Sequence, residues 1–473
     1  MVTWTSAREL CARLQQGRVS AVDVMQEVYA RIERVNPQVN ALVNLLPLDD
    51  ALKLAEQADQ VDIAHRGLLH GLPMAPKDAV EVKGFPTTWG FSPWAQRIAQ
   101  QDDEQARRLR AAGAIFIGHS NMPEFGLGSN TFNSIFGKTL NPYNLNKTAG
   151  GSSGGAAVAL ATQMLPLADG SDMGGSLRNP ASFCNVVGLR PSVGRVPNGR
   201  AFSWLARLGI TGPMARNVAD LALLFSVQAG PDHTDPITLP EPGETFFDAY
   251  EPLPNLQGLR IANITDALGV PIEHEVLDVL SRCQSTLQDL GARLTNESPD
   301  LSQAMQVFQT QRAATMAPLG HQLDRTVPDW RSAAKDTAIW NIEKGQQIDA
   351  QELLQSELQR SQIYAEVAEF MQDYDAMILP AAQVVPFDVN QEWVEQINNE
   401  QMDTYIDWMT VCCAITVTGL PAISIPGGFS QAGLPIGLQI VGKPRGDLAL
   451  LRLAHTFEQA TQHYQTLPQV SAV

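Results

Sequence analysis

Apolar residues recur at helical spacing near the N-terminus. The positions i, i+3, i+4 and i+7 of one predicted helix, which share a face, are occupied by Met25, Val28, Tyr29 and Ile32. Further upstream, Ser6 and Glu9 have the spacing of a capping box at the start of a helix. The first forty residues therefore predict two helices, and we expect the N-terminal helical segment to cover residues 1–60.

Between about residues 61 and 230, predicted helices alternate with short apolar stretches. A helix is expected to end near Gly113, and Ala114–Gly118 (AIFIG) then has the composition of a buried strand. Leu165–Gly170 (LPLADG) is a second such stretch and follows an apolar helix. Strands that alternate with helices are typical of a sheet covered on both faces. We expect an α/β fold, a single large domain whose central sheet is mixed and mostly parallel.

The second half of the chain predicts a different order of elements. Residues 231–254 are rich in proline and acidic residues and predict a surface excursion. The pattern over 275–370 is mostly helical, within a helical region assigned to 275–410. In 411–473 apolar residues alternate as in strands, at Ile423, Ile425, Ile436, Leu438 and Ile440. A last helix is predicted to bury Leu450, Leu453, Ala454 and Phe457.

Composition narrows the class of protein. The chain has 473 residues, is 44% hydrophobic and can bury a large core. Its formal net charge of −17 argues against a nucleic-acid partner and against binding to anionic membranes. We see no signal peptide and no apolar run long enough to span a bilayer. The cysteines form neither a metal-binding spacing nor a disulfide framework, and predict buried reduced thiols in a cytoplasmic protein: Cys11, Cys184, Cys283, Cys412 and Cys413.

The stretch KTAGGSSGGAAVAL, residues 147–160, places two serines between pairs of glycines and runs into an apolar helix. Glycines permit close backbone approach, and the helix would direct its free N–H groups at the serines. Ser152 and Ser153 each fit G-x-S-x-G, but no downstream histidine lies in a recognisable strand-end loop. No Gly-Lys-Ser/Thr follows, as a phosphate-binding loop would need. Ser332–Lys335 (SAAK) fits S-x-x-K without its companion motifs and is expected on a solvated helix face.

Two further stretches carry candidate chemistry. GSDMGGSLRNPASF, residues 170–183, contains a second glycine-flanked serine, Ser176. GLPMAPKDAV, residues 71–80, places Lys77 among apolar neighbours. Taken alone, Lys77 is more typical of an ordinary lysine with a buried stem. A lysine acts as a base only when neutral, and burial disfavours its ammonium form.

Together these stretches resemble the amidase signature family, which includes the glutaminase (A) subunit of glutamyl-tRNA(Gln) amidotransferase and fatty acid amide hydrolase. The resemblance covers nearly the whole chain. It extends to NMPEFGLGSN (121–130), VVGLRPSVGRVP (186–197) and GLPAISIPGGF (419–429). The order and spacing of Lys77, Ser152 and Ser176 along the chain also resemble those of the family.

The resemblance implies a Ser–Ser–Lys triad for the hydrolysis of linear amides through an acyl-enzyme. Ser176 would be the nucleophile, Ser152 the bridging serine held by a cis peptide, and Lys77 the base. A serine hydroxyl becomes a strong nucleophile only when a base takes its proton. The resemblance implies no metal, no other cofactor and a small-molecule amide as substrate.

Further site residues also follow from the resemblance. An oxyanion needs preorganised donors, which would be the backbone N–H groups of Met173, Gly174, Gly175 and Ser176. The acyl pocket would be lined by Leu127, Gly128 and Ser129. Supporting roles around the nucleophile would fall to Asp172, Arg178 and Ser153. Candidates for an aromatic pocket wall, with ordinary core packing as the alternative, are Trp89, Trp340, Tyr405 and Trp408.

Three alternatives stay open beside a stand-alone amidase. The first is the glutaminase subunit, which usually carries F/Y-D-G-x-x-Y-G; the comparable residues 313–322, AATMAPLGHQ, lack it. Met409 stands where that subunit has an acid before the late Gly-Leu-Pro, and Asp407 is the nearest acid. The others are a serine esterase and a non-catalytic binding protein on the same fold. A homodimer is a possible assembly.

Overall fold

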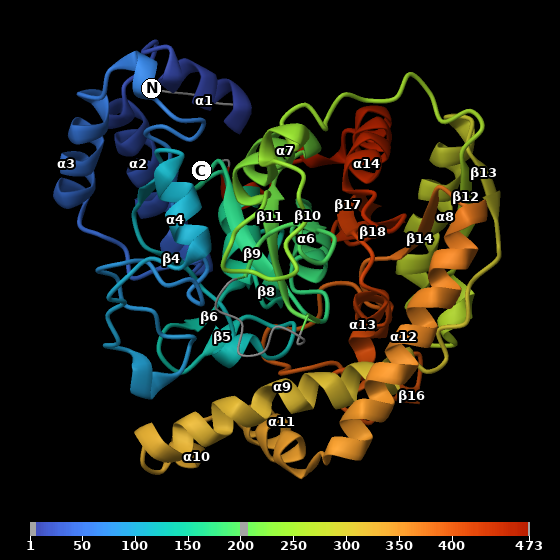
Figure 1. Ribbon diagram of the computed structural model, residues 1–473. Coiled ribbons are helices and arrows are strands. Elements are labelled where there is room, and N and C mark those ends of the chain that lie inside the picture. The colour runs from blue at the N-terminus through green and yellow to red at the C-terminus, as the bar shows by residue number, and fades with distance from the viewer. Residues whose placement is uncertain (1–5, 199–206, 472–473) are drawn as a thin grey trace.

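A mixed sheet forms the centre of the computed structural model, which describes residues 6–198 and 207–471. Its strand order is β13-β12-β14-β18-β17-β10-β11-β9 (Figure 1). The bounds are β9 Ala168–Asp172, β10 Val187–Arg190, β11 Ile210–Ala215, β12 Arg260–Asn263, β13 Arg293–Thr295, β14 Ala376–Pro380, β17 Ala422–Phe429 and β18 Pro435–Gly442. The two C-terminal strands confirm the alternation seen in the sequence.

The sheet is mixed as expected, but the expectation that it is mostly parallel is wrong. β12 pairs in parallel with β13 and β14, whereas the other neighbouring strands of this sheet run antiparallel. The reason lies in the crossover from β9 through helix α6 (Arg178–Phe183) to β10. β9 and β10 run in the same direction, but β11 returns between them and pairs antiparallel with both.

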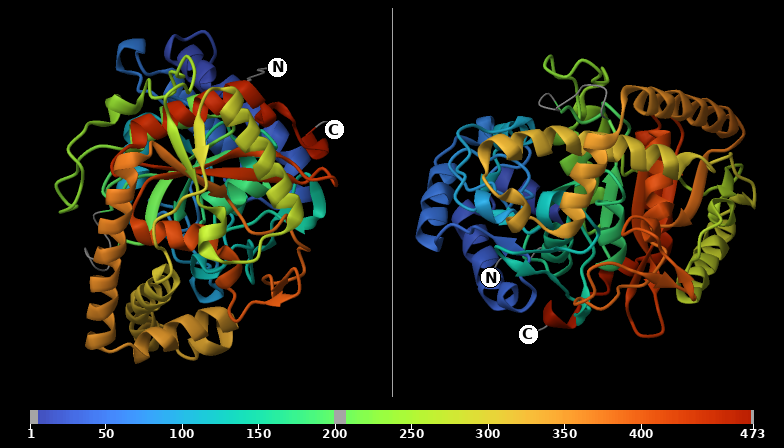
Figure 2. Two further views of the ribbon diagram at one scale, coloured as in Figure 1. Left: turned by 90° about the vertical axis from the view of Figure 1, so that its right-hand side faces the viewer. Right: turned by 90° about the horizontal axis from the view of Figure 1, so that it is seen from below.

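Helices cover both faces of the sheet (Figure 2). A side chain on Gly437 of β18 would clash with Ser182 of α6, whereas one on Gly442 would approach Leu450 of α14 (Asp447–Thr461). Because strand residues alternate between faces, α6 and α14 lie on opposite faces. α5 (Gly154–Ala161) contacts α6, and α7 (Val218–Gln228) contacts α14. The α/β class with helices on both faces is therefore confirmed.

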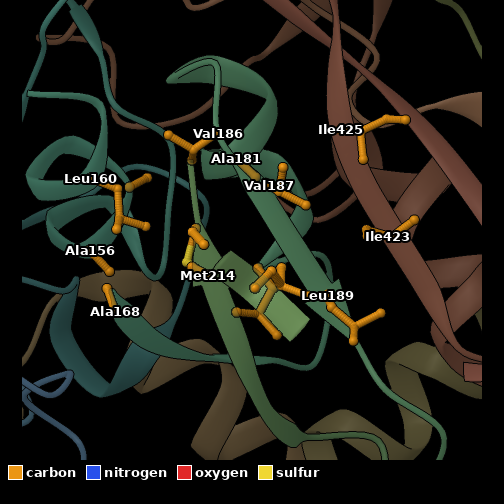
Figure 3. Close-up of a cluster of buried hydrophobic side chains, with 14 of the residues drawn as sticks. Ala156, Leu160, Ala168, Ala181, Val186, Val187, Leu189, Met214, Ile423 and Ile425 are labelled. Carbon is orange, nitrogen blue, oxygen red and sulfur yellow. The ribbon is translucent and has the colours of Figure 1, made fainter. Parts of the chain in front are cut away.

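Small and branched apolar side chains form the part of the core between the sheet and α5 (Figure 3). Figure 3 shows Ala156 and Leu160 of α5 near Ala168 of β9. Every residue of α5 is buried, which explains why its sequence is apolar on all sides. The helix that follows the glycine–serine loop is thereby held rigidly against the sheet.

The two predicted N-terminal helices are confirmed as α1 (Ala7–Gln15) and α2 (Ala21–Val39). Ser6 caps α1 by accepting a hydrogen bond from the Glu9 N–H. The predicted apolar stripe of α2 is buried, and α3 (Leu48–Asp59) packs against this helix.

Short strands position the segment that leads to Lys77. The strand expected over 114–118 is reduced to β3 (Ile115–Phe116), which pairs in parallel with β2 (Pro73–Met74). The helix before it is α4 (Glu104–Ala111). The remaining short strands are β1 Leu42–Val43, β4 His119–Ser120, β5 Phe132–Asn133, β6 Gly137–Lys138, β7 Leu140–Asn141, β8 Asn144–Thr148, β15 Gln396–Ile397 and β16 Glu400–Gln401.

The pattern over 275–370 is confirmed as mostly helical, with β13 as a strand within it: α8 His274–Asp289, α9 Ala304–Thr326, α10 Trp330–Ala333, α11 Asp336–Gln347 and α12 Ala350–Asp373. The extension of the helical region to 410 is wrong, because β14, β15 and β16 follow α12. Helices α9 to α12 form an arm beside the sheet, drawn in gold and orange in Figure 1, whereas α8 packs on the sheet itself. α9 also contacts α13 (Thr410–Thr418), next to the sheet. The excursion over 231–254 is irregular except for a short 3-10 helix, Gly243–Phe246.

Two further features of the fold are the state of the cysteines and the lengths of the helices. All five cysteines are buried and free, as the sequence predicts. Among the residues described, none of the helices combines the length and the apolar character needed to cross a bilayer.

Candidate active site

The Lys77 side chain lies in a cluster of serine hydroxyls. It follows β2 and is only 1% exposed. Its Nζ is 2.6 Å from Ser152 Oγ, 3.1 Å from Ser153 Oγ and 3.0 Å from Ser171 Oγ. The structure therefore joins two of the three predicted triad residues directly, and it adds Ser171, which the sequence analysis did not single out.

Burial changes the protonation of this lysine. It lowers the pKa of Lys77 to about 7, although the carboxyls of Asp169 and Asp172 act in the opposite direction. The ordinary pKa of a lysine is about 10.4, so almost no exposed lysine is neutral at pH 7. This lower pKa favours the neutral amine, which proton abstraction requires.

The loop that carries Ser152 lies between β8 and α5, and its Gly151–Ser152 peptide is cis. Ser129 Oγ donates a 2.7 Å hydrogen bond to the Gly151 carbonyl oxygen and accepts one of 3.3 Å from the Gly151 N–H. Ser129, predicted as a pocket residue, thus holds the backbone next to Ser152.

The glycines after the two serines pack against neighbouring backbone. A Cβ on Gly155 would lie 2.3 Å from the Asn121 backbone nitrogen and 2.5 Å from the Ala41 oxygen. The Gly155 N–H donates to the Asn121 carbonyl oxygen at 3.1 Å. This N–H of the helix start is therefore used inside the protein, contrary to the expectation that it points at the serines.

Ser176 lies in the turn between β9 and α6 and is half-buried. Its backbone carbonyl oxygen accepts a 3.3 Å hydrogen bond from the Ser153 N–H. Within 6–198 and 207–471, no hydrogen bond joins the Ser176 hydroxyl to Ser152 or Lys77. The backbone therefore holds Ser176 near the pair, and hydrogen bonds of this kind often tighten only when substrate is bound.

A buried ion pair fixes the turn that carries Ser176. Arg178 donates to both carboxylate oxygens of Asp172, at 3.0 and 2.8 Å. The same carboxylate accepts the N–H groups of Gly175 and Leu177 at 3.0 and 3.1 Å. Burial opposes both charges, yet the pairing outweighs it, so the pKa of Asp172 lies below its usual range and that of Arg178 above. Asp172 is therefore a carboxylate at any working pH.

The backbone amides before Ser176 are unequal as oxyanion donors. The Gly175 N–H is already used by Asp172, which leaves Met173, Gly174 and Ser176 of the predicted set. Gly175 has φ +107°, and a Cβ there would lie 2.7 Å from the Cβ of Cys412 in α13. Glycine is needed at this position both for the conformation and for the close approach of α13.

A small cavity is lined by the predicted pocket residues Leu127 and Gly128 together with Lys335 and Tyr405. Lys335 Nζ donates to the Leu127 carbonyl oxygen at 2.6 Å. Lys335 is half-buried and burial lowers its pKa to about 8, so the expectation of a solvated SAAK lysine is wrong. Lys335 lies in the short segment between α10 and α11, which directs the Lys335 side chain inward.

This cavity lies next to the Ser176 turn. Gly128 precedes Ser129, whose Oγ accepts a 3.1 Å hydrogen bond from Asn179 Nδ2. The Asn179 N–H in turn donates to the Gly175 carbonyl oxygen at 2.7 Å. Asn179 thus links pocket and nucleophile turn, and nothing in its sequence position had indicated this contact.

The four candidate wall aromatics have different surroundings. Tyr405 lines the cavity, and its hydroxyl accepts hydrogen bonds from Arg312 and Asn341. Trp340 is 37% exposed and meets the Tyr405 ring edge-on, with centroids 6.0 Å apart. Trp408 belongs to the main core, and Trp89 packs against a second apolar cluster that includes Leu127.

The site and fold can be compared with known proteins. The family model described as Amidase matches residues 23–451. An acylamidase of Rhodococcus erythropolis is 33% identical, over 96% of this chain and 95% of its own length. The glutamyl-tRNA(Gln) amidotransferase (A) subunit of Picosynechococcus is 31% identical, over 98% of this chain and 100% of its own.

Solved structures indicate the same family as the sequence comparisons. A bacterial aryl acylamidase of the amidase signature family superposes with a TM-score of 0.89 at 28% identity, covering 100% of this chain and 99% of that one. The glutamyl-tRNA(Gln) amidotransferase (A) subunit from Thermotoga maritima gives 0.79 at 26% identity, covering 98% of both chains. The chain belongs to the amidase family, in the amidase signature class, and is an enzyme that hydrolyses amides.

Proposed function

We propose that this protein is a stand-alone amidase that converts a carboxylic amide to a carboxylate and ammonia or an amine, through an acyl-enzyme on Ser176. Ser152 relays the proton, and Lys77 is the base. The observation that carries the proposal is the buried Lys77 Nζ, 2.6 Å from Ser152 Oγ.

The first step needs a proton acceptor. A neutral amine has two N–H donors and one lone pair, and Lys77 Nζ has three hydroxyl neighbours. We assign the lone pair to the shortest contact, so that the Ser152 hydroxyl donates to Lys77. Ser152 then accepts the proton of Ser176, whose oxygen attacks the amide carbonyl carbon.

The attack moves negative charge onto the carbonyl oxygen. The N–H groups of Met173, Gly174 and Ser176 are the proposed donors, and losing one such donor typically costs about 2.7–4 kcal/mol of barrier. The proton held by Lys77 returns through Ser152 to the leaving nitrogen, and the C–N bond breaks. Water then adds to the acyl carbon while the same relay takes its proton. The relay returns this proton to the Ser176 oxygen as the acyl C–O bond breaks, which frees the Ser176 hydroxyl and releases the acid as its carboxylate.

Two observations favour a stand-alone amidase over the amidotransferase subunit. The segment 313–322, inside α9, lacks the stretch usual in that subunit. The TM-score is also higher with the aryl acylamidase than with the Thermotoga subunit. Buried free cysteines support a cytoplasmic location for the enzyme.

A fluorophosphonate probe tests the nucleophile. We expect it to modify Ser176, located by mass spectrometry of the digested protein, and Ser176→Ala should abolish the labelling. Ser332→Ala, at an exposed position, is the matched control and should label like the parent. Labelling of Ser153 or Ser332 in the parent would contradict the assignment.

A panel of amides tests the reaction class. Aliphatic, aromatic and amino-acid amides, scored for ammonia or amine release, should include good substrates among the first two groups. Turnover of glutamine alone would favour the amidotransferase subunit. Turnover of matched esters without any amide would favour the esterase.

A further inference from the structure

A second buried carboxyl, Asp169, lies beside the base. It is on β9, is 1% exposed, and its Oδ2 accepts a hydrogen bond of 3.5 Å from the Lys77 backbone N–H. Its Oδ1 has no hydrogen-bond partner in the described part of the chain. Buried polar atoms are nearly always paired, so an unpaired carboxyl oxygen next to an active-site lysine needs a reason.

The charges around Lys77 show why Asp169 differs from its neighbour Asp172. Asp172 is neutralised by Arg178, and Arg190 Nη1 lies 3.5 Å from its Oδ1. For Asp169, no ion pair with a lysine or arginine is found across 6–198 and 207–471. Of the two carboxyls that act on Lys77, Asp169 is therefore the one whose charge is not compensated.

We propose that Asp169 is a positioning residue that raises the basicity of Lys77, because its buried, uncompensated carboxyl lies against the Lys77 segment and binds the Lys77 backbone N–H. The inference rests on the proposed role of Lys77 as the base. Charges interact more strongly in a buried site than in water, so an ionised carboxyl at this position favours the ammonium form of the Lys77 amine.

The consequence concerns the transition state. When Ser152 passes its proton to Lys77, positive charge develops on Nζ. An ionised Asp169 stabilises that charge, and a protonated Asp169 does not. Asp169 thus raises the basicity of Lys77 without touching the substrate.

Protonation of both groups falls in one pH range. Burial raises the pKa of Asp169 to about 7, with the carboxylate of Asp103 at the start of α4 adding to the rise and Lys77 opposing it. The pKa of Lys77 is lowered to about 7 as well. Two interacting groups that titrate in the same pH range shift each other's titration.

The first test compares pH profiles. In the parent, the rate of fluorophosphonate labelling of Ser176 should decrease as the pH is lowered, and the pH of half-maximal rate is the midpoint. In Asp169→Asn, which keeps the shape and an acceptor for the Lys77 N–H, the midpoint should move down by about one pH unit, because the amine loses an attractive charge. A midpoint within about 0.2 pH units of the parent would overturn the proposal.

Asp78→Asn is the matched control. Asp78 follows Lys77, is equally buried, and its carboxylate accepts from the Thr88 N–H at 3.0 Å on the other side of the segment. We expect no shift of the midpoint. An equal shift in both variants would show that any lost carboxyl acts in this way, and would also overturn the proposal.

A reciprocal measurement does not depend on the asparagine variant folding. In protein labelled with ¹³C in the aspartate carboxyls, Lys77→Met should move the titration of Asp169 to higher pH, because linkage acts equally in both directions. If Asp169 titrates at the same pH in Lys77→Met as in the parent, the result contradicts the interaction between Asp169 and Lys77. Ser176 labelling that survives in Lys77→Met would refute the proposed function itself, whereas lost labelling with unmoved titrations would refute only the coupling.

Discussion

The backbone N–H of Ser153 donates a 3.3 Å hydrogen bond to the carbonyl oxygen of Ser176. This bond joins two glycine–serine loops, one before α5 in the sequence and one after it. One loop holds the partner of the lysine, and the other holds the proposed nucleophile. The contact therefore sets the distance between relay and nucleophile through the backbone rather than through mobile side chains.

Removing the amine should abolish catalysis while the fold is kept. Lys77→Met retains the length and apolar volume of the buried stem, so circular dichroism and the melting temperature should change little. General-base catalysis contributes about 10²–10⁴-fold, and we expect kcat/KM on an anilide to fall by at least that factor. Lys53→Met, on the exposed side of α3, is the control. Near-normal turnover by Lys77→Met at every pH would remove lysine from the mechanism.

The pH dependence follows from the same group. Lysine acts as a base only in its neutral form, which predominates above its pKa. Because burial lowers the pKa of Lys77 to about 7, kcat/KM should rise with pH through about 7 and level off above it. Steady-state rates between pH 5 and 9, limits chosen as about two units either side of that pKa, would measure this. A profile that is flat across this range would conflict with the assignment.

Ser171 should contribute to holding the amine. It supplies one of three hydroxyls around Lys77 Nζ, at 3.0 Å. A hydrogen bond of this kind is worth about 1–1.5 kcal/mol, so Ser171→Ala should lower kcat about tenfold without raising KM. Ser298→Ala, outside the site, is a control of the same chemistry. A change in KM alone would instead indicate contact with substrate.

Loss of the buried arginine should destabilise the Ser176 turn. Arg178→Met leaves the carboxylate of Asp172 buried with Arg190 as its remaining cation. Breaking a buried pair costs about 3–5 kcal/mol, and urea unfolding should show a loss of this order together with slower labelling of Ser176. Arg331→Met removes two exposed pairs, with Asp324 and Glu343, and should cost less than about 1 kcal/mol. Equal losses in the two variants would contradict this account.

Local signals in the sequence were sufficient for many elements. The spacing of Met25, Val28 and Ile32 predicted α2, and the alternation around Ile423 predicted β17. These features depend on neighbours a few residues away, so periodicity identifies them. Periodicity could not predict whether neighbouring strands run parallel or antiparallel, because β11 inserts between β9 and β10 by a long-range pairing.

The sequence by itself determined the family of the chain and the candidate residues for its chemistry. Lys77, Ser152 and Ser176 stand in family motifs whose order and spacing can be read from the chain alone. Only the tertiary structure decided what surrounds them: the burial that makes the Lys77 amine partly neutral, the hydroxyl of Ser171, and the uncompensated carboxyl of Asp169. The physical reason is that a pKa depends on desolvation and nearby charge, which come from segments far apart in the chain and meet only on folding.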